Sequence, residues 1–208
     1  MTGRDGAFGI LIGAAVATLA LLLTHCSAQE PPPASCAFLS DRSPIEDLTL
    51  CAERGDVEAQ FNLGLLYSVG GGVPRDDAKA VYWWRLAAEQ GHADAQLDLG
   101  FMYKWGDGVA AEDDPEAVRW FQLAAEQGQV EAQIYLGQHY FDGEGVPRNY
   151  ALADMWLQIA AMQGGPLFEE VAQETRRLFE QQMTREQIAE AQRLSREWIE
   201  THPQDGGN

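Results

Sequence analysis

Residues 57–165 hold three tandem copies of one unit, and this repetition limits the fold more than any other feature of the chain. Equivalent tyrosines are separated by 36 and then 37 residues, whereas equivalent tryptophans are separated by 37 and then 36. The additional residue therefore lies in the acidic segment 112–115 of the second copy, which we interpret as a loop. Self-similarity at a period of about 20 to 50 residues is typical of a solenoid, in which each unit packs on its neighbours.

Each copy has the pattern of two helices joined by a glycine turn. In the first helix a Leu-Gly pair and a tyrosine lie at i, i+1 and i+4, on one face, where glycine allows a neighbouring helix to approach closely. A Gly-x-Gly-Val turn ends this helix, because glycine accepts positive φ. The second helix carries the tryptophan and an Ala-Ala pair. Its expected N-caps are Asp76, Asp113 or Asp114, and Asn149, and its expected left-handed C-caps are Gly91, Gly128 and Gly164.

Helical segments on both sides of the repeats are predicted to cap the stack. Residues 44–55 match the second helix of a repeat and form a capping half-repeat, whereas 166–202 form two capping helices. In the latter, Val171, Leu178 and Phe179 share a helical face, and Thr184 with Gln187 forms a capping box. A short tail, 203–208, follows. The aromatic columns are expected in the core: Tyr67, Trp83, Tyr103, Trp120, Tyr140 and Trp156.

The recurring columns resemble the Sel-1-like repeat, a helix-turn-helix unit related to the tetratricopeptide repeat. The resemblance covers repeats at 57–92, 93–129 and 130–165. It implies an all-α fold, an α-solenoid of antiparallel helix pairs with a tetratricopeptide-like superhelix and helical caps at both ends. It also implies an exported bacterial adaptor or regulator, which binds a partner protein or peptide in its concave groove.

The N-terminal segment 1–28 is interpreted as a signal peptide, because residues 7–23 are apolar or glycine and Cys26-Ser27-Ala28 offers a cleavage site. Two alternatives stay open, an uncleaved membrane anchor and a lipoprotein modified at Cys26. A proline-rich linker, 29–43, follows the signal. A periplasmic or secreted location is therefore expected, with membrane contact only through an uncleaved or lipidated N-terminus.

Two cysteines, Cys36 and Cys51, remain after cleavage at Ala28. An even number of cysteines in an exported chain favours a disulfide between them. The alternative is that Cys51 is simply a small buried residue, because it lies in the column of Ala87, Ala124 and Ala160.

Charge and motifs exclude several classes of function. A formal charge of −18 opposes binding to nucleic acid, since phosphate contacts need Lys or Arg. No nucleophile motif, phosphate loop or pair of histidines at metal-ligand spacing is present in the sequence, so no catalytic residue, metal or cofactor is expected. We expect a monomer. The enzymatic alternative is β-lactam binding or weak hydrolysis, as reported for cysteine-rich members of the family, but this chain has no cysteine after Cys51.

Residues that vary between the copies on the first helices are the candidates for partner binding, since repeat packing does not explain them. Trp105 stands out, because the equivalent positions hold Val69 and Asp142 and tryptophan is common in binding hot spots. By register with the tetratricopeptide unit, the predicted partner-binding residues are Phe61, Leu65, Leu97, Phe101, Lys104, Trp105, Ile134, Gln138 and Phe141. Acidic residues among their neighbours favour a basic or polar-aromatic partner segment.

Overall fold

The computed structural model describes residue 36 and residues 45–202, and the regular structure of these residues is helical throughout. The predicted signal peptide, most of the linker and the tail lie outside the described residues. Among those described, no helix is both long and apolar enough to span a membrane. The helices are α2 (Ile45–Glu53), α3 (Val57–Val69), α4 (Asp77–Glu89), α5 (Ala93–Trp105), α6 (Asp114–Glu126), α7 (Val130–Asp142), α8 (Tyr150–Gln163), α9 (Gly165–Glu180) and α10 (Arg185–Thr201).

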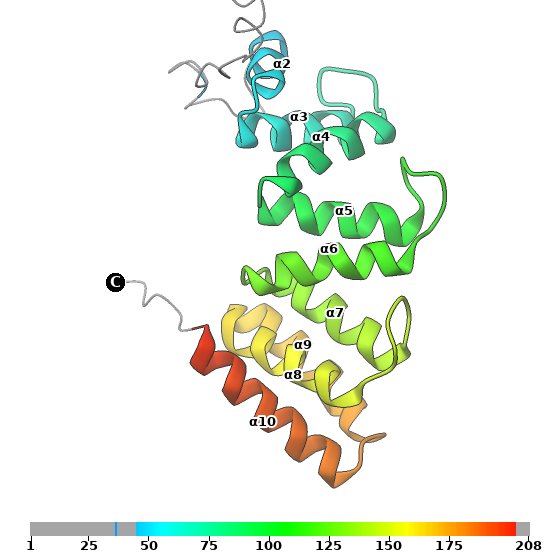
Figure 1. The fold of residues 1–208 in the computed structure, drawn as a ribbon, viewed down its shortest axis with the longest axis vertical. Coiled ribbons are helices and arrows are strands. Elements are labelled where there is room, and N and C mark those ends of the chain that lie inside the picture. Colours follow the sequence, from blue (N-terminus) through cyan, green and yellow to red (C-terminus); the bar gives the residue numbers. More distant parts are fainter. Residues whose placement is uncertain (1–35, 37–44, 203–208) are drawn as a thin grey trace, which may run out of the picture.

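The helices follow one another along the long axis of the molecule (Figure 1). Each repeat is a helix pair, α3 with α4, α5 with α6 and α7 with α8, and the second helix of one pair packs on the first helix of the next. At the N-terminal end α2 packs on α3, as the second helix of a repeat would. At the other end α9 packs on α8 and α7, and α10 returns to pack on α8. The predicted all-α solenoid is confirmed.

Most helix ends lie at the predicted residues. The N-caps of α4, α6 and α8 are Asp76, Asp113 and Asn149, and each side chain accepts the amide three residues later. The prediction for Gly164 was wrong, because its φ is −83° and the positive φ falls on Gly165. The reason is that Gly164 is at once the C-cap of α8 and the N-cap of α9, so no loop separates these helices.

Close packing within each helix pair depends on the glycine of the Leu-Gly pair. A Cβ on Gly64 would collide with the ring of Trp84, and one on Gly100 with the ring of Phe121. In the third repeat a Cβ on Gly137 would press against the backbone of Ala153 and the side chain of Leu157. In each repeat, therefore, the residue directly after the predicted core tryptophan fills the space that the glycine leaves open.

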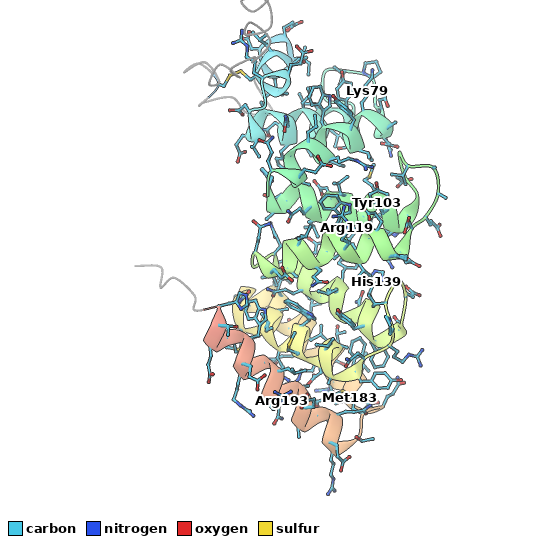
Figure 2. The ribbon with its side chains drawn as sticks, viewed as in Figure 1. Lys79, Tyr103, Arg119, His139, Met183 and Arg193 are labelled. Atoms are coloured by element: carbon cyan, nitrogen blue, oxygen red, sulfur yellow. A yellow bond between two sulfur atoms is a disulfide. The ribbon has the colours of Figure 1, made fainter. Side chains whose placement is uncertain are left out.

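This packing changes the expected core. Side chains fill the space between neighbouring helices (Figure 2), and Tyr103, Trp120 and Trp156 are buried there. Trp83 is less buried than predicted, because in the first repeat its neighbour Trp84 occupies the buried position against Gly64. Three predicted core aromatics are only partly buried and pack against the edges of the core clusters: Tyr67, Trp83 and Tyr140.

A buried glutamine at the start of each first helix joins successive units. Gln60, Gln96 and Gln133 each donate to a backbone carbonyl near the end of the preceding second helix, those of Ala52, Ala88 and Ala125. Each also bonds to a glutamine of its own repeat, namely Gln90, Gln127 and Gln163. Each of these carbonyls also accepts a backbone amide of the following turn, so the glutamine supplies its second hydrogen bond and ties two units together, which explains why a polar residue recurs at a buried position.

The two caps differ in how they are attached. A disulfide joins Cys36 to Cys51 of α2, and both residues are buried with Leu48 and Leu63. At the C-terminal end Arg176 of α9 bonds to the buried carboxylate of Asp154. The Thr184–Gln187 capping box starts α10 as predicted.

The predicted apolar face of α9 needs correction. Phe179 is buried, but Val171 and Leu178 are exposed. Ala172 and Phe168 pack inward with Phe179 instead. The helix is therefore rotated relative to the expected face, with its smaller contact residue, Ala172, toward α7 and α8.

Candidate protein-binding face

The first helices of the three repeats present a continuous line of accessible residues. On α5, Asp94, Asp98, Phe101 and Trp105 follow at i, i+4, i+7 and i+11, which places them on one side of the helix. We call this line and its equivalents the first-helix stripe, and none of its members is buried. The equivalents are Glu58, Asn62, Leu65 and Val69 on α3, and Glu131, Tyr135, Gln138 and Asp142 on α7.

The structure places only some of the predicted partner-binding residues on this stripe: Leu65, Phe101, Trp105 and Gln138. Leu97 and Ile134 were wrong predictions, because both are buried in core clusters. Their column faces the next unit along the stack: the equivalent Phe61 stacks on His92, with ring centroids 4.3 Å apart. Ile134 is likewise covered by α9, as is Phe141, whose ring stacks on Phe179. The last predicted residue, Lys104, is half-buried beside the next repeat.

Eight of the twelve stripe residues were not among the predicted partner-binding residues, and three of these eight are equivalent to one another: Asn62, Asp98 and Tyr135. They form one column, four residues after Glu58, Asp94 and Glu131. A search for one helical face with spacings of four, three and four residues would have found them.

An aromatic group lies at the centre of the stripe. The rings of Phe101 and Trp105 stack with centroids 4.8 Å apart, and the ring of Tyr135 on α7 meets Phe101 edge-on at 4.8 Å. Phe121 lies buried beneath and contacts both Phe101 and Tyr135. Trp105 is 53% exposed, so this large aromatic surface is fixed by a buried ring and open to solvent.

Carboxylates continue the same stripe. Asp98 lies one turn after Asp94 and one turn before Phe101 on α5, and Glu131 lies on α7. Burial raises the pKa of Asp98 to about 7, and the negative charges of Asp94 and Glu131 act in the same direction. No ion pair involves these three carboxylates within residues 45–202. The stripe thus holds negative charge that the described chain does not neutralise.

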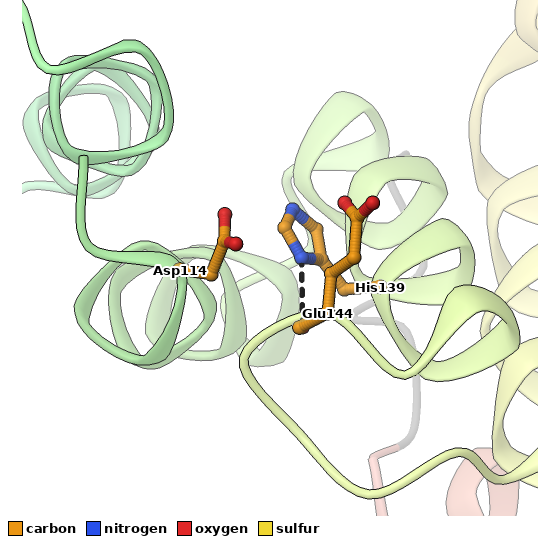
Figure 3. A group of neighbouring side chains, drawn as sticks. All are labelled: Asp114, His139 and Glu144. Atoms are coloured by element: carbon orange, nitrogen blue, oxygen red, sulfur yellow. Dashed lines mark hydrogen bonds between the residues drawn. The ribbon is translucent and has the colours of Figure 1, made fainter.

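A second polar group lies where the third repeat meets the second. Asp114, His139 and Glu144 bring ligand-type atoms within 4.8 Å of one another (Figure 3). The Nδ1 atom of His139 donates to the carbonyl oxygen of Glu144, 3.0 Å away, so its Nε2 atom accepts. The ammonium group of Lys104 lies 3.4 Å from this Nε2 atom and 3.5 Å from the Glu144 carboxylate. The positive charge beside Asp114, His139 and Glu144 is therefore that of Lys104. We interpret these four residues as a polar contact between the second and third repeats.

Replacement of Lys104 by methionine should raise the pKa of His139. Burial lowers this pKa below its usual value, and the charge of Lys104 lowers it further, so removal of the ammonium group favours the imidazolium form. An NMR pH titration of the imidazole carbons measures the change. The control is Lys79→Met on α4, and a His139 pKa that does not rise in the Lys104 variant would contradict the assigned contact.

Known proteins share both the repeats and the fold. The family model described as Sel1 repeat matches residues 57–92, 93–129 and 130–165. One similar structure is that of c5321, a protective antigen with an SLR fold that is present in uropathogenic Escherichia coli strains. Its sequence is 38% identical to this one and the TM-score is 0.66. The match covers 75% of this chain and 32% of that chain. A Sel1 repeat protein from Oxalobacter formigenes is 39% identical with a TM-score of 0.57, over 62% of this chain and 97% of that chain.

This chain therefore spans about a third of the length of the E. coli antigen. No curated protein matches it. The resemblance deduced from the repeating columns is confirmed, and since the three matched repeats cover more than half of the sequence, the chain belongs to the Sel1 repeat family.

Proposed function

We propose that the protein is an exported interaction scaffold or regulator, which binds a segment of another protein along the first-helix stripe. Helical repeat folds of this kind generally mediate protein–protein binding, and they use extended surfaces built from equivalent helices. The stripe is such a surface, since it runs through α3, α5 and α7 without a buried residue.

The observation that carries the proposal is the aromatic group at Trp105. Its ring is exposed, although the equivalent Val69 and Asp142 show that repeat packing does not require an aromatic residue there. An exposed tryptophan held by stacking on Phe101 offers a large contact area at little cost in side-chain entropy.

Export is supported by two features at the N-terminal end. The apolar segment 7–23 has the pattern of a signal peptide. The Cys36–Cys51 disulfide is of the kind that persists in oxidising compartments such as the periplasm.

Replacement of Trp105 by alanine should weaken binding of the partner at least tenfold, or about 1.4 kcal/mol, because tryptophans at interface centres carry large shares of binding energy. The partner is first identified by photocrosslinking in the bacterial envelope with a benzophenone amino acid at position 105. Its affinity for the purified wild-type and variant proteins is then measured by calorimetry.

Tyr82 gives a matched control, because it is 57% exposed but lies on the second helix α4. A probe at position 82 should not capture the same protein, and Tyr82→Ala should leave the affinity unchanged. Equal capture from both positions, or wild-type affinity in the Trp105 variant, would contradict a binding surface on the first-helix stripe.

A further inference from the structure

Building on the protein-binding function proposed above, we propose that the α5–α7 part of the first-helix stripe receives an arginine of the partner segment. The guanidinium group would lie among the carboxylates of Asp94, Asp98 and Glu131, next to the aromatic rings of the stripe. The inference concerns the chemistry of the occupant, which the fold alone does not determine.

The geometry brings the acidic and aromatic residues together. Asp98 is one helical turn from Asp94 on one side and one turn from Phe101 on the other. The neighbouring helix α7 is in contact at both ends of this segment. Gln129, the N-cap of α7, donates to the Asp94 carboxylate, and the ring of Tyr135 contacts Phe101. Acidic groups and rings thus form one continuous surface across two repeats.

The charges of this surface are not balanced by the described part of the chain. Asp94 has a neutral hydrogen-bond donor, Gln129, and no cation among residues 45–202. Lys104 lies on the same helix, but its ammonium group is directed to His139 and Glu144. The helices that pack on either side of α5 direct their arginines elsewhere, since Arg85 of α4 bonds to Tyr103 and Arg119 of α6 bonds to Glu116.

A cation from outside would therefore relieve the repulsion among these carboxylates. The pKa of Asp98 agrees with this argument, because its rise to about 7 reflects a half-buried carboxyl group with two acidic neighbours. Pairing with a positive charge favours the ionised form, so binding and ionisation of Asp98 should reinforce each other.

Arginine fits this surface better than lysine. Its planar guanidinium group pairs with carboxylates through two parallel hydrogen bonds and stacks on aromatic faces, whereas the lysine ammonium is a compact and strongly hydrated charge. The rings of Phe101, Trp105 and Tyr135 lie next to the acidic residues, so one side chain can use both kinds of contact.

The test uses N-acetyl-arginine amide as the probe, titrated at millimolar concentrations into the ¹⁵N-labelled protein at pH 8. We expect the largest amide shifts at Asp94, Asp98 and Glu131, with a shift of the Trp105 indole. N-acetyl-citrulline amide has nearly the same shape without the charge and should not produce these shifts. Asp98→Asn should weaken arginine binding about tenfold, as expected for loss of a charge-assisted hydrogen bond. The control Glu46→Gln, an exposed acidic residue on α2, should leave binding unchanged.

Acidification supplies an independent readout. At pH 5.5 Asp98 is protonated in the free protein, so the probe should bind more weakly than at pH 8, and the Asp98→Asn variant should lose this difference. Equal shifts with the arginine and citrulline probes, or shifts centred elsewhere, would overturn the arginine site. The protein-binding function has its own test: a partner captured at position 105 whose affinity falls in Trp105→Ala but not in Asp98→Asn would support the binding face and reject the arginine.

Discussion

Replacement of Gly108 by alanine is expected to lower the free energy of unfolding by roughly 3 to 5 kcal/mol. Gly108 lies in the turn of the second repeat with φ +67°, a conformation that a side chain disfavours by about 1 to 2 kcal/mol. In addition, a Cβ there would collide with the backbone carbonyl of Asp77, the first residue of α4 in the preceding repeat. Backbone at a helix start has little freedom to move, so the repeats would have to separate. Urea denaturation followed by circular dichroism measures the effect.

The same turn in the other repeats provides the controls. Gly145 meets the carbonyl of Asp114 at the start of α6, so Gly145→Ala should be about as destabilising as Gly108→Ala. Gly72 has φ +83°, and no atom of the described residues lies within 4 Å of the added Cβ. Gly72→Ala should therefore cost only the conformational term, about 1 to 2 kcal/mol. Equal losses in all three variants would show that the turn glycines serve conformation alone and not the contact between repeats.

The fold could be predicted from the sequence because the same helix–helix contact occurs in all three repeats and requires the same residue each time. Gly64, Gly100 and Gly137 each allow a partner helix to approach, so the same residue recurs at each position. The partner column at Trp84, Phe121 and Leu157 was not recognised, because its members are all large and apolar but differ in identity. For the same reason Trp83 was given a more buried place than it has.

The binding face was harder to predict, since residues that face solvent are not constrained by packing. The register taken from the tetratricopeptide unit counted Leu97 and Ile134 as accessible, but their column is covered by the following unit. At the C-terminal end the following unit is α9, whose sequence does not repeat the pattern. The repeat alignment therefore could not indicate that Phe179 of α9 covers Phe141. Asp98 was missed because the register taken from the tetratricopeptide unit does not include its column, which holds Asn62 and Tyr135 in the other repeats.

Replacement of Asp98 by asparagine should stabilise the protein by roughly 2 to 4 kcal/mol at pH 8 and have little effect near pH 4. The folded-state pKa of Asp98 is raised from 3.8 to about 7. As the pH rises above 4, the unfolded chain therefore ionises at this position while the folded chain stays protonated. Stability contributed by the protonated group is complete below about pH 4, is lost progressively up to about pH 7, and does not fall further above it. Urea denaturation of both proteins at a series of pH values measures the difference.

Glu46→Gln is the control for this pH series, because Glu46 is exposed on α2 and its replacement should give no comparable stabilisation. A difference between wild type and Asp98→Asn that does not grow between pH 4 and pH 7 would contradict a raised pKa. If the difference does grow, the wild-type chain retains a carboxylate that weakens its own fold at neutral pH. Residues that reduce stability in this way are expected where a protein binds something, since selection for binding opposes the gain in stability. The same variant would then be more stable and bind arginine less well, which joins the two properties in one side chain of the first-helix stripe.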